Sequence, residues 1–372
     1  MESILFTPIR IAGVEIPNRF VRSATHEFMA GEDDGAPSDR HIQLFASLAE
    51  GEVGLIITGH AYVQPIGKAS PRQTGIYDDR LVEPLSRIPP AVHRFASKIF
   101  IQIAHAGRQT KDRLAGGTPV APSPVFEPVV KVMPRELTGD EIRALIRDFA
   151  AAGRRAKEAG FDGVQIHAAH GYLLSAFLSP YTNKRSDEWG GPAENRVRAI
   201  VEIILAMKAL VGRDYPVIAK WNSTDFLSGG LAVEESVEMA GRAIEAGLDG
   251  IETSGGSSES GRGSMWAGVR PESEEGYFVE AAAKFKKALP VPVIGLGGNR
   301  TFAAMERIIA SGRADLVSLS RPFIREPFLV RDFRLGRTSK SACISCNKCF
   351  NPRGITCGDL KNKTNGAEGI PL

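Results

Sequence analysis

A short motif recurs three times along this chain of 372 residues. Residues 157–163 read Lys-Glu-Ala-Gly-Phe-Asp-Gly, residues 244–250 read Ile-Glu-Ala-Gly-Leu-Asp-Gly, and residues 310–316 read Ala-Ser-Gly-Arg-Ala-Asp-Leu. Each copy is typical of a helix end, a tight turn and the start of a strand. A unit that recurs in this way predicts helices and strands alternating around one sheet.

Short apolar segments alternate with amphipathic ones over most of the chain. We predict eight strands, at Arg19–Ala24, Gly54–His60, Ile99–Ala104, Gly163–Ala168, Val217–Trp221, Gly250–Ser254, Val291–Leu296 and Leu316–Ser320. A helical segment follows most of them, which is typical of a parallel barrel. The predicted fold is therefore an α/β protein, a (β/α)8 TIM barrel over residues 1–336. Residues 337–372 form a short cysteine-containing tail that is not an independent domain.

The best-defined helix is predicted between Glu141 and Ala159, with Thr138 as the candidate N-cap and Gly160 as the stop. One apolar stripe runs along it at helical spacing, formed by Ile142, Leu145, Ile146, Phe149 and Ala152. Two long connections, Gln109–Arg135 and Ser175–Arg196, follow the third and fourth strands and contain several prolines and glycines. Loops at the C-terminal ends of barrel strands build substrate pockets, so we expect the pocket there.

The composition excludes several classes of function. Charged residues make up 24% of the chain and the net charge is +3. This balance lacks the excess of basic residues that is typical of proteins that bind nucleic acid or an anionic membrane. No apolar run approaches the roughly 18 residues of a membrane-spanning helix. The first residues lack the basic region and apolar core of a signal peptide. We expect a soluble, cytoplasmic protein.

The segment Gly163–Tyr172 carries the clearest chemical signal. An apolar strand runs into His167 and His170, three residues apart, and then into Gly171 and Tyr172. Two imidazoles and a phenol at the end of a buried strand can hold a carbonyl oxygen and deliver a proton. The alternative is one histidine in a core hydrogen bond and one on the surface. The place of this motif in the barrel pattern favours the functional interpretation.

All four cysteines lie in one stretch near the C-terminus: Cys343, Cys346, Cys349 and Cys357. In a cytosolic protein this clustering argues against disulfides and for a metal, a cluster or the relic of one. Sets of four thiolates suit iron–sulfur clusters or zinc. A [4Fe-4S] cluster, a zinc ion and an empty site therefore all stay open.

Further segments occur in a recognisable order between Leu5 and Phe328. They are Leu5–Pro8, Asn18–Val21, Gly54–Ile57, Gln102–Arg108, Phe177–Pro180, Arg185–Gly191 and Gly312–Leu316. Together with the histidine pair, they resemble the FMN-dependent ene-reductases of the old yellow enzyme type. The resemblance implies a barrel that binds FMN noncovalently at its C-terminal mouth and is reduced by NAD(P)H. It further implies a ping-pong cycle that reduces the C=C bond of an electron-poor alkene, an α,β-unsaturated carbonyl compound.

The resemblance also implies roles for individual residues. Gln102 matches the glutamine at the flavin pyrimidine edge, and Lys220 matches a basic residue beside flavin N1 that is commonly arginine. His167 and His170 match the pair that holds the substrate carbonyl oxygen, and Tyr172 matches the proton donor. The other cofactor-binding candidates are Ala24, Thr25, His26, His60, Gly297, Gly298, Ser320 and Arg321, of which the last four would bind the phosphate.

His26 and the cysteines resemble one branch of that family, which contains 2,4-dienoyl-CoA reductase and 2-enoate reductase. Larger members of this branch hold a [4Fe-4S] cluster after the barrel and add FAD and NAD(P) domains, which we do not expect here. The cysteine spacing departs from that branch. The rival interpretation is a dehydrogenase or demethylase related to trimethylamine dehydrogenase, which passes electrons through the cluster to a redox protein. A second copy of the chain as partner, the natural alkene and the choice of NADH or NADPH all stay open.

Overall fold

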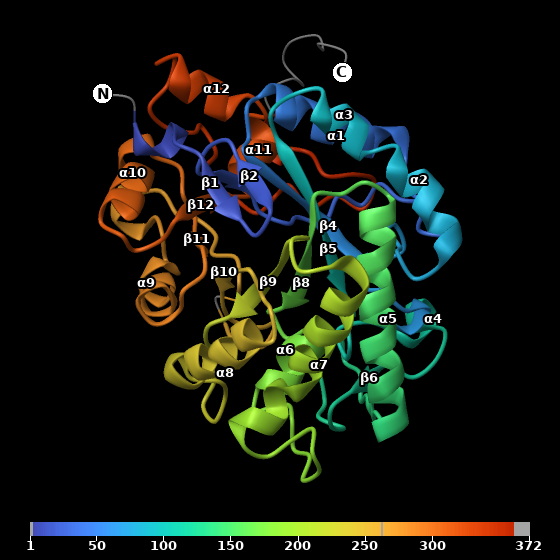
Figure 1. Ribbon diagram of the computed structural model, residues 1–372. Coiled ribbons are helices and arrows are strands. Elements are labelled where there is room, and N and C mark those ends of the chain that lie inside the picture. Colours follow the sequence, from blue (N-terminus) through green and yellow to red (C-terminus); the bar gives the residue numbers. More distant parts are fainter. Residues whose placement is uncertain (1–2, 262, 361–372) are drawn as a thin grey trace.

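A closed barrel of eight parallel strands forms the centre of the computed structural model, which describes residues 3–261 and 263–360 (Figure 1). Around the barrel the strands are β3 (Phe20–Arg22), β4 (Leu55–Tyr62), β5 (Lys98–Ala104), β8 (Gly163–Ala168), β9 (Val217–Asn222), β10 (Gly250–Ser254), β11 (Val293–Gly295) and β12 (Leu316–Leu319), which pairs with β3. Each predicted strand overlaps one of these eight. The predicted TIM-barrel fold is therefore confirmed.

Helices surround the barrel and bury their apolar stripes against it (Figure 1). The longer ones are α1 (Asp39–Glu50), α5 (Gly139–Glu158), α7 (Ala193–Val211), α8 (Val233–Glu245), α9 (Val279–Ala288) and α10 (Phe302–Ala310), and α2 (Val82–Ser86) and α3 (Pro89–His93) are short. Single 3-10 turns occur at Ile4–Phe6, Pro65–Gly67, Asp79–Leu81 and Glu272–Glu274. The predicted N-cap of α5 is confirmed, because Glu141 N donates to Thr138 Oγ1. Thr138 N also donates to the Glu141 carboxylate, which completes a capping box. Across the described residues, no helix combines the length and apolar character needed to cross a membrane.

A hairpin absent from the sequence prediction plugs one end of the barrel. Its strands are β1 (Ile9–Ile11) and β2 (Val14–Ile16). Ile11 and Ile16 pack against side chains near the N-terminal ends of the barrel strands, including Val21, Leu55, Phe100, Ile218 and Leu316. The interior is therefore apolar and filled at this end, which leaves the C-terminal end for a site.

The two long loops predicted at the C-terminal end contain short elements of their own. The first holds α4 (Asp112–Ala115), β6 (Val120–Ala121) and β7 (Arg135–Glu136). The second is shorter than predicted, because α6 (Leu173–Leu178) and the start of α7 take up its two ends.

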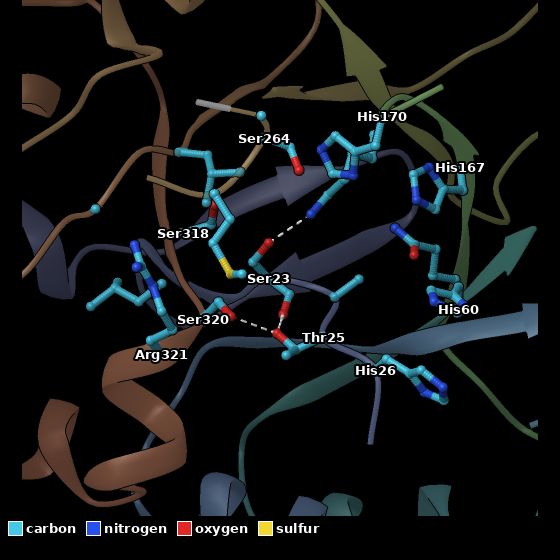
Figure 2. A pocket seen from close by; sticks show the side chains of 18 of the residues that line it. Ser23, Thr25, His26, His60, His167, His170, Ser264, Ser318, Ser320 and Arg321 are labelled. Atoms are coloured by element: carbon cyan, nitrogen blue, oxygen red, sulfur yellow. Dashed lines mark hydrogen bonds between the residues drawn. The ribbon is translucent and has the colours of Figure 1, made fainter. Parts of the chain in front are cut away.

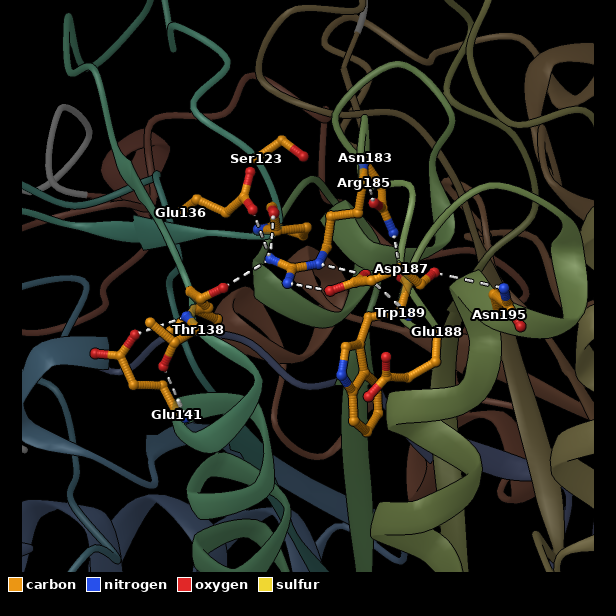
Figure 3. A network of polar contacts seen from close by, with 12 residues as sticks. Ser123, Glu136, Thr138, Glu141, Asn183, Arg185, Asp187, Glu188, Trp189 and Asn195 are labelled. Atoms are coloured by element: carbon orange, nitrogen blue, oxygen red, sulfur yellow. Dashed lines mark hydrogen bonds and ion pairs between the residues drawn. The ribbon is translucent and has the colours of Figure 1, made fainter.

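Arg185 joins these loops (Figure 3). Its guanidinium donates to the carbonyl oxygens of Pro122 and Leu137 at 3.1 and 2.6 Å, and it pairs with Asp187 and Glu136. Hydrogen bonding to Asp187 raises the pKa of Arg185 further, so the guanidinium stays charged. Arg185 thus holds the two loops together.

After β12 the chain forms α11 (Arg321–Arg325) and α12 (Leu329–Arg334). The cysteine-containing segment that follows folds back over the C-terminal end of the barrel. Ser341 N donates to Arg300 O at 2.9 Å, and Ile355 N donates to Glu27 O at 2.8 Å. Residues 361–372 of the predicted tail lie outside the described residues, and the division at residue 336 stays a prediction.

Candidate active site

A cavity of about 460 Å³ opens at the C-terminal end of the barrel. It is lined by almost all the predicted cofactor and substrate residues: Ala24, Thr25, His26, His60, Gln102, His167, His170, Tyr172, Lys220, Gly298, Ser320 and Arg321. The imidazoles of His60, His167 and His170 lie on one side of the cavity, and Ser320 and Arg321 lie on the other (Figure 2).

Gly297 is the exception, since it lies beside the cavity lining and not in it. Its φ angle is +133°, and a Cβ atom there would stand 2.6 Å from Tyr277 N and 2.8 Å from Phe278 N. Glycine is therefore needed at this turn by close packing of the backbone.

The floor of the cavity is a connected set of buried polar side chains. Gln102 Nε2 donates to Gln165 Oε1 at 2.7 Å, and Gln165 Nε2 donates to Glu252 Oε2 at 2.9 Å. Lys220 Nζ lies 3.2 Å from Glu252 Oε2 and donates to Ser23 Oγ at 2.7 Å. These partners satisfy groups that would otherwise be costly to bury. They hold one amide and one ammonium group in place beneath the cavity.

Strand register explains why these side chains meet. Gln102 stands opposite Gln165, while Lys220 stands opposite both Glu252 and His167. Side chains at paired positions of neighbouring strands point to the same face of a sheet. All five side chains, Gln102 among them, therefore point into the barrel.

The predicted histidine pair and tyrosine come together at the end of β8. The ring centroids of His167 and His170 are 5.1 Å apart, and those of His167 and Tyr172 are 4.7 Å apart. Ala169 N donates to His167 Nδ1 at 3.4 Å, which puts the hydrogen of a neutral His167 on Nε2. His170 Nε2 is already paired with Ser254 Oγ at 2.7 Å, a contact the sequence did not predict.

A strained turn carries these groups out of β8. His170 has a φ angle of +65°, which is uncommon for a residue with a side chain, and Gly171 follows at +77°. Gln109 Nε2 donates to His170 O at 2.7 Å, and His170 N donates to Asn222 Oδ1 at 3.3 Å. Hydrogen bonds to Gln109, in the loop after β5, and to Asn222, at the end of β9, thus hold the backbone that presents Tyr172.

Burial keeps this cluster uncharged near neutral pH. Burial, with smaller contributions from Lys220 and His60, lowers the pKa of His170 to about 3. Burial first, then His170, His60 and Lys220, hold the pKa of His167 well below its usual value. Burial also raises the pKa of Tyr172 to about 12. The cavity therefore offers neutral N–H and O–H donors to a ligand oxygen.

His26 lies near the same cluster. Its Nε2 is paired with Ser70 Oγ, and its ring centroid is 4.8 Å from that of His60. Burial, followed by the neighbouring His60 and His41, holds the pKa of His26 well below its usual value. It is therefore a neutral part of the cavity wall.

The opposite side of the cavity carries the predicted phosphate residues. Thr25 Oγ1 lies 2.7 Å from Ser320 Oγ, and Gly298 adopts a φ of +72°. Arg321 Nη1 donates to Trp266 O at 2.8 Å and to Asn347 Oδ1 at 2.6 Å. The guanidinium is thus fixed between the loop after β10 and the cysteine-containing segment.

The four cysteines line a separate, small cavity of about 20 Å³ beside Arg321 and Arg325. Burial raises the pKa of Cys343, and it raises the pKa of Cys349 to about 11, so these two are protonated thiols at neutral pH. Within residues 3–261 and 263–360, no three His, Cys, Asp or Glu side chains are placed to hold a metal ion. The cysteines share one cavity, but in this arrangement they are not a metal-ligand set.

The sequence did not identify several residues of the site. Gln165 and Glu252, which hold Gln102 and Lys220 from beneath, are polar residues within apolar strands, a signal that could have identified them. Ser257, Met265 and Phe350 line the cavity itself. They come from a long loop and from the cysteine-containing segment, where no periodicity indicates which side chains turn inward.

A barrel with an ammonium, an amide, neutral imidazoles and a phenol at its C-terminal mouth has the layout of a TIM-barrel enzyme. Residues 4–340 match the model of the NADH:flavin oxidoreductase / NADH oxidase family, and the chain belongs to this family. The resemblance to old yellow enzyme is thereby confirmed.

Individual relatives are similar to the chain over most of its length, as the family model is. The chain is 40% identical to an NADH oxidase of Thermoanaerobacter brockii over 98% of its own length, but it spans only 57% of that relative. It is 35% identical to an NADPH dehydrogenase of Listeria monocytogenes serotype 4a, covering 90% of this chain and 96% of the relative. The structure of an old yellow enzyme homologue from Zymomonas mobilis matches with a TM-score of 0.80 and 28% identity, over 95% of this chain and 97% of the other.

The cavity suits the FMN that this family implies. Its volume falls in the range of about 300–1,000 Å³ that small-molecule sites occupy. FMN carries a polar ring edge at one end and a phosphate at the other. The cavity has an amide and a cation on its floor, at Gln102 and Lys220, and a second cation, Arg321, beside the left-handed Gly298. The donor set therefore fits the group at both ends.

Proposed function

We propose that this protein reduces the C=C bond of α,β-unsaturated carbonyl compounds with NAD(P)H in a ping-pong cycle. The observation that carries the proposal is the meeting of His167, His170 and Tyr172 on one wall of the cavity, all three neutral near pH 7. Neutral donors grip a carbonyl oxygen without protonating it in advance, and they strengthen as negative charge develops on that oxygen. The substrate is thus an electron-poor alkene.

Each residue then has a defined task. His167, through its Nε2–H, and His170 bind the carbonyl oxygen and orient the alkene. Tyr172 gives its phenolic proton to the α-carbon. When bound, FMN supplies the chemistry that takes a hydride from the nicotinamide and passes it to the β-carbon.

The cofactor contacts belong to the same proposal. Gln102 would bind the pyrimidine edge of the flavin ring, and Lys220 would stabilise negative charge at flavin N1. Ala24, Thr25, His26 and His60 would line the ring. Gly298, Ser320 and Arg321 would hold the phosphate, with Gly297 shaping the turn beside them.

Two separate measurements test the proposal. Purified protein should be yellow and should release FMN, not FAD, on denaturation. Under anaerobic conditions, NADH or NADPH should bleach the flavin, and 2-cyclohexenone should then restore its absorbance with formation of cyclohexanone. Protein that cannot be reconstituted with FMN, or reduced protein that the alkene does not reoxidise, would overturn the proposal.

The cysteines support a second candidate. All four line one cavity, and we propose that they draw together around a [4Fe-4S] cluster when the metal is supplied. Such a cluster would favour a dehydrogenase that passes electrons to a redox protein. Zinc and free thiols are the competing outcomes of metal analysis. Because the arrangement described here is not a metal-ligand set, no step of the alkene reduction is routed through a metal.

A further inference from the structure

The amide orientation of the buried Gln73 is set by two backbone groups. Ala69 N donates to Gln73 Oε1 at 2.6 Å, and Gln73 Nε2 donates to His60 O at 3.1 Å. A backbone N–H only donates and a carbonyl oxygen only accepts, so turning the amide round would lose both bonds. The same Nε2 lies 2.7 Å from His60 Nδ1. An amide nitrogen only donates, and His60 Nδ1 must therefore accept.

This bond sets the tautomer of His60. Burial lowers the pKa of His60 to about 4, so the ring is neutral at pH 7. A neutral imidazole that accepts at Nδ1 carries its hydrogen on Nε2. Nε2 lies 3.4 Å from the phenolic oxygen of Tyr172. His60 is thus the donor in this contact, and the hydrogen of Tyr172 points away from His60.

A bulge in β4 brings His60 to this position. Ile57 pairs with Phe100 and His60 pairs with Gln102, so three steps along β4 correspond to two along β5. The extra residue turns His60 to the same side as Gln102, toward the cavity. Gly59 N donates to Glu27 Oε1 at 2.7 Å, and a Cβ atom on Gly59 would collide with that carboxylate. The bulge therefore depends on glycine.

We propose that His60 and Gln73 are positioning residues for proton transfer and act through Tyr172. The inference rests on the proposed function. In this step the O–H bond of Tyr172 breaks and a C–H bond forms at the α-carbon of the substrate, whose β-carbon takes the hydride of the reduced flavin. The electron pair of the O–H bond stays on the phenolate oxygen, and a solvent proton later restores the phenol. The Nε2–H of His60 stabilises that phenolate.

The distance of 3.4 Å suits such a role. Hydrogen bonds of catalytic groups are commonly long before substrate binds and shorten as charge develops. Burial disfavours the phenolate of Tyr172, and a donor at its oxygen offsets part of that cost. Tyr172 with no donor beside it would be a poorer acid in this cavity.

The test compares two replacements of His60 that differ in reach. In His60→Gln the side-chain amide reaches the place of Nε2 and can donate to Tyr172, whereas in His60→Asn it reaches only the place of Nδ1. The FMN-loaded variants are reduced anaerobically with NADPH and mixed with 2-cyclohexenone in a stopped-flow instrument. We expect His60→Asn to slow flavin reoxidation by about 10- to 100-fold and His60→Gln to recover most of it. Reduction by NADPH should be similar in the two variants.

The two His60 variants are also made in protein that carries Tyr172→Phe. This background separates an effect of His60 through Tyr172 from a general structural effect of replacing His60. If His60 acts through Tyr172, His60→Asn should slow reoxidation no further in that background. Equal rates for His60→Gln and His60→Asn, or equal slowing with and without Tyr172, would overturn this inference alone. If Tyr172→Phe has no effect on reoxidation, the assigned proton donor is wrong and this inference falls with it. Wild-type protein that the alkene never reoxidises would refute the proposed function itself.

A second variant covers the case in which His60→Asn loses FMN. Gln73→Leu leaves His60 in place but removes the bond that sets its tautomer. Reoxidation should then slow by a smaller factor than in His60→Asn, while an unchanged rate would contradict the role of Gln73.

Discussion

Lys220 Nζ lies 3.2 Å from Glu252 Oε2, and both side chains are almost completely buried on the floor of the cavity. The pair spans β9 and β10 at directly opposed positions. Because Lys220 also lines the cavity, its charge is placed to act on a bound flavin ring.

We expect Lys220→Met to lower the reduction potential of the bound flavin by about 30 mV or more, since the cation that favours the anionic reduced ring is lost. Lys220→Arg is the matched control, because it keeps the charge, and its potential should stay near that of the wild type. Dye-equilibrated reductive titration of the FMN-loaded proteins gives both values. Equal potentials for the methionine and arginine variants would contradict this role for Lys220.

The histidine pair should matter more for alkene turnover than for cofactor binding. Replacing both His167 and His170 with alanine should lower turnover of 2-cyclohexenone by about 100-fold or more, because two donors to the developing enolate oxygen are removed. FMN should stay bound, which its visible spectrum reports. Turnover retained by the double variant would show that the pair is structural.

Acid should destabilise the protein through its buried histidines. Burial lowers the pKa of His105 to about 3 in the native state. Below about pH 6.5 the His105 imidazole is therefore protonated in the unfolded state but still neutral in the native state. The stabilising contribution of neutral His105 is complete above that pH and falls as the pH drops toward 3. Between pH 7 and pH 5 this residue alone should reduce the free energy of unfolding by about 2 kcal/mol.

His105→Asn is the matched variant for this effect. His105 Nδ1 accepts a hydrogen bond from Gly107 N at 3.0 Å, and the asparagine oxygen can take over that bond without titrating. Urea unfolding at pH 7 and pH 5 should show a smaller acid loss in the variant. Identical losses in the two proteins would place the acid sensitivity elsewhere.

Metal analysis decides the state of the cysteines. Anaerobically prepared protein should contain about four irons per chain if Cys343, Cys346, Cys349 and Cys357 hold a [4Fe-4S] cluster, and about one zinc if they hold that ion. The expected result is iron, with absorbance beyond the flavin bands that bleaches with dithionite. Four thiols that titrate freely in metal-free protein would identify the segment as a relic.

The strands and the main site residues could be predicted from the sequence because both are marked by short apolar segments that contain a few polar residues. The predicted strand Gly163–Ala168 coincides with β8, where apolar residues alternate with inward-facing Gln165 and His167. Polar residues within a buried strand indicate a cavity or a polar site inside the barrel. Gln102, His167 and Lys220, which were predicted from such positions, line the cavity.

Other features depend on contacts that no local pattern records. The hairpin strands β1 and β2 have three residues each, too few to show a period, yet they close the barrel. The bulge that places His60 beside Tyr172 depends on Glu27, which is 32 residues from Gly59. Phe350 reaches the cavity only because the last part of the chain folds back over the barrel.

The central claim is hydride transfer to the β-carbon of an alkene, followed by transfer of the solvent-exchangeable phenolic proton of Tyr172 to the α-carbon. The most direct test reduces 2-cyclohexenone with NADPH deuterated at C4, and then in D2O with unlabelled NADPH, and locates the label by NMR. The account predicts deuterium at the β-carbon of cyclohexanone in the first case, and at the α-carbon in the second after exchange of the ketone is corrected for. No reduction of the double bond, or a β-carbon labelled from D2O while C4 deuterium is not transferred, would contradict it.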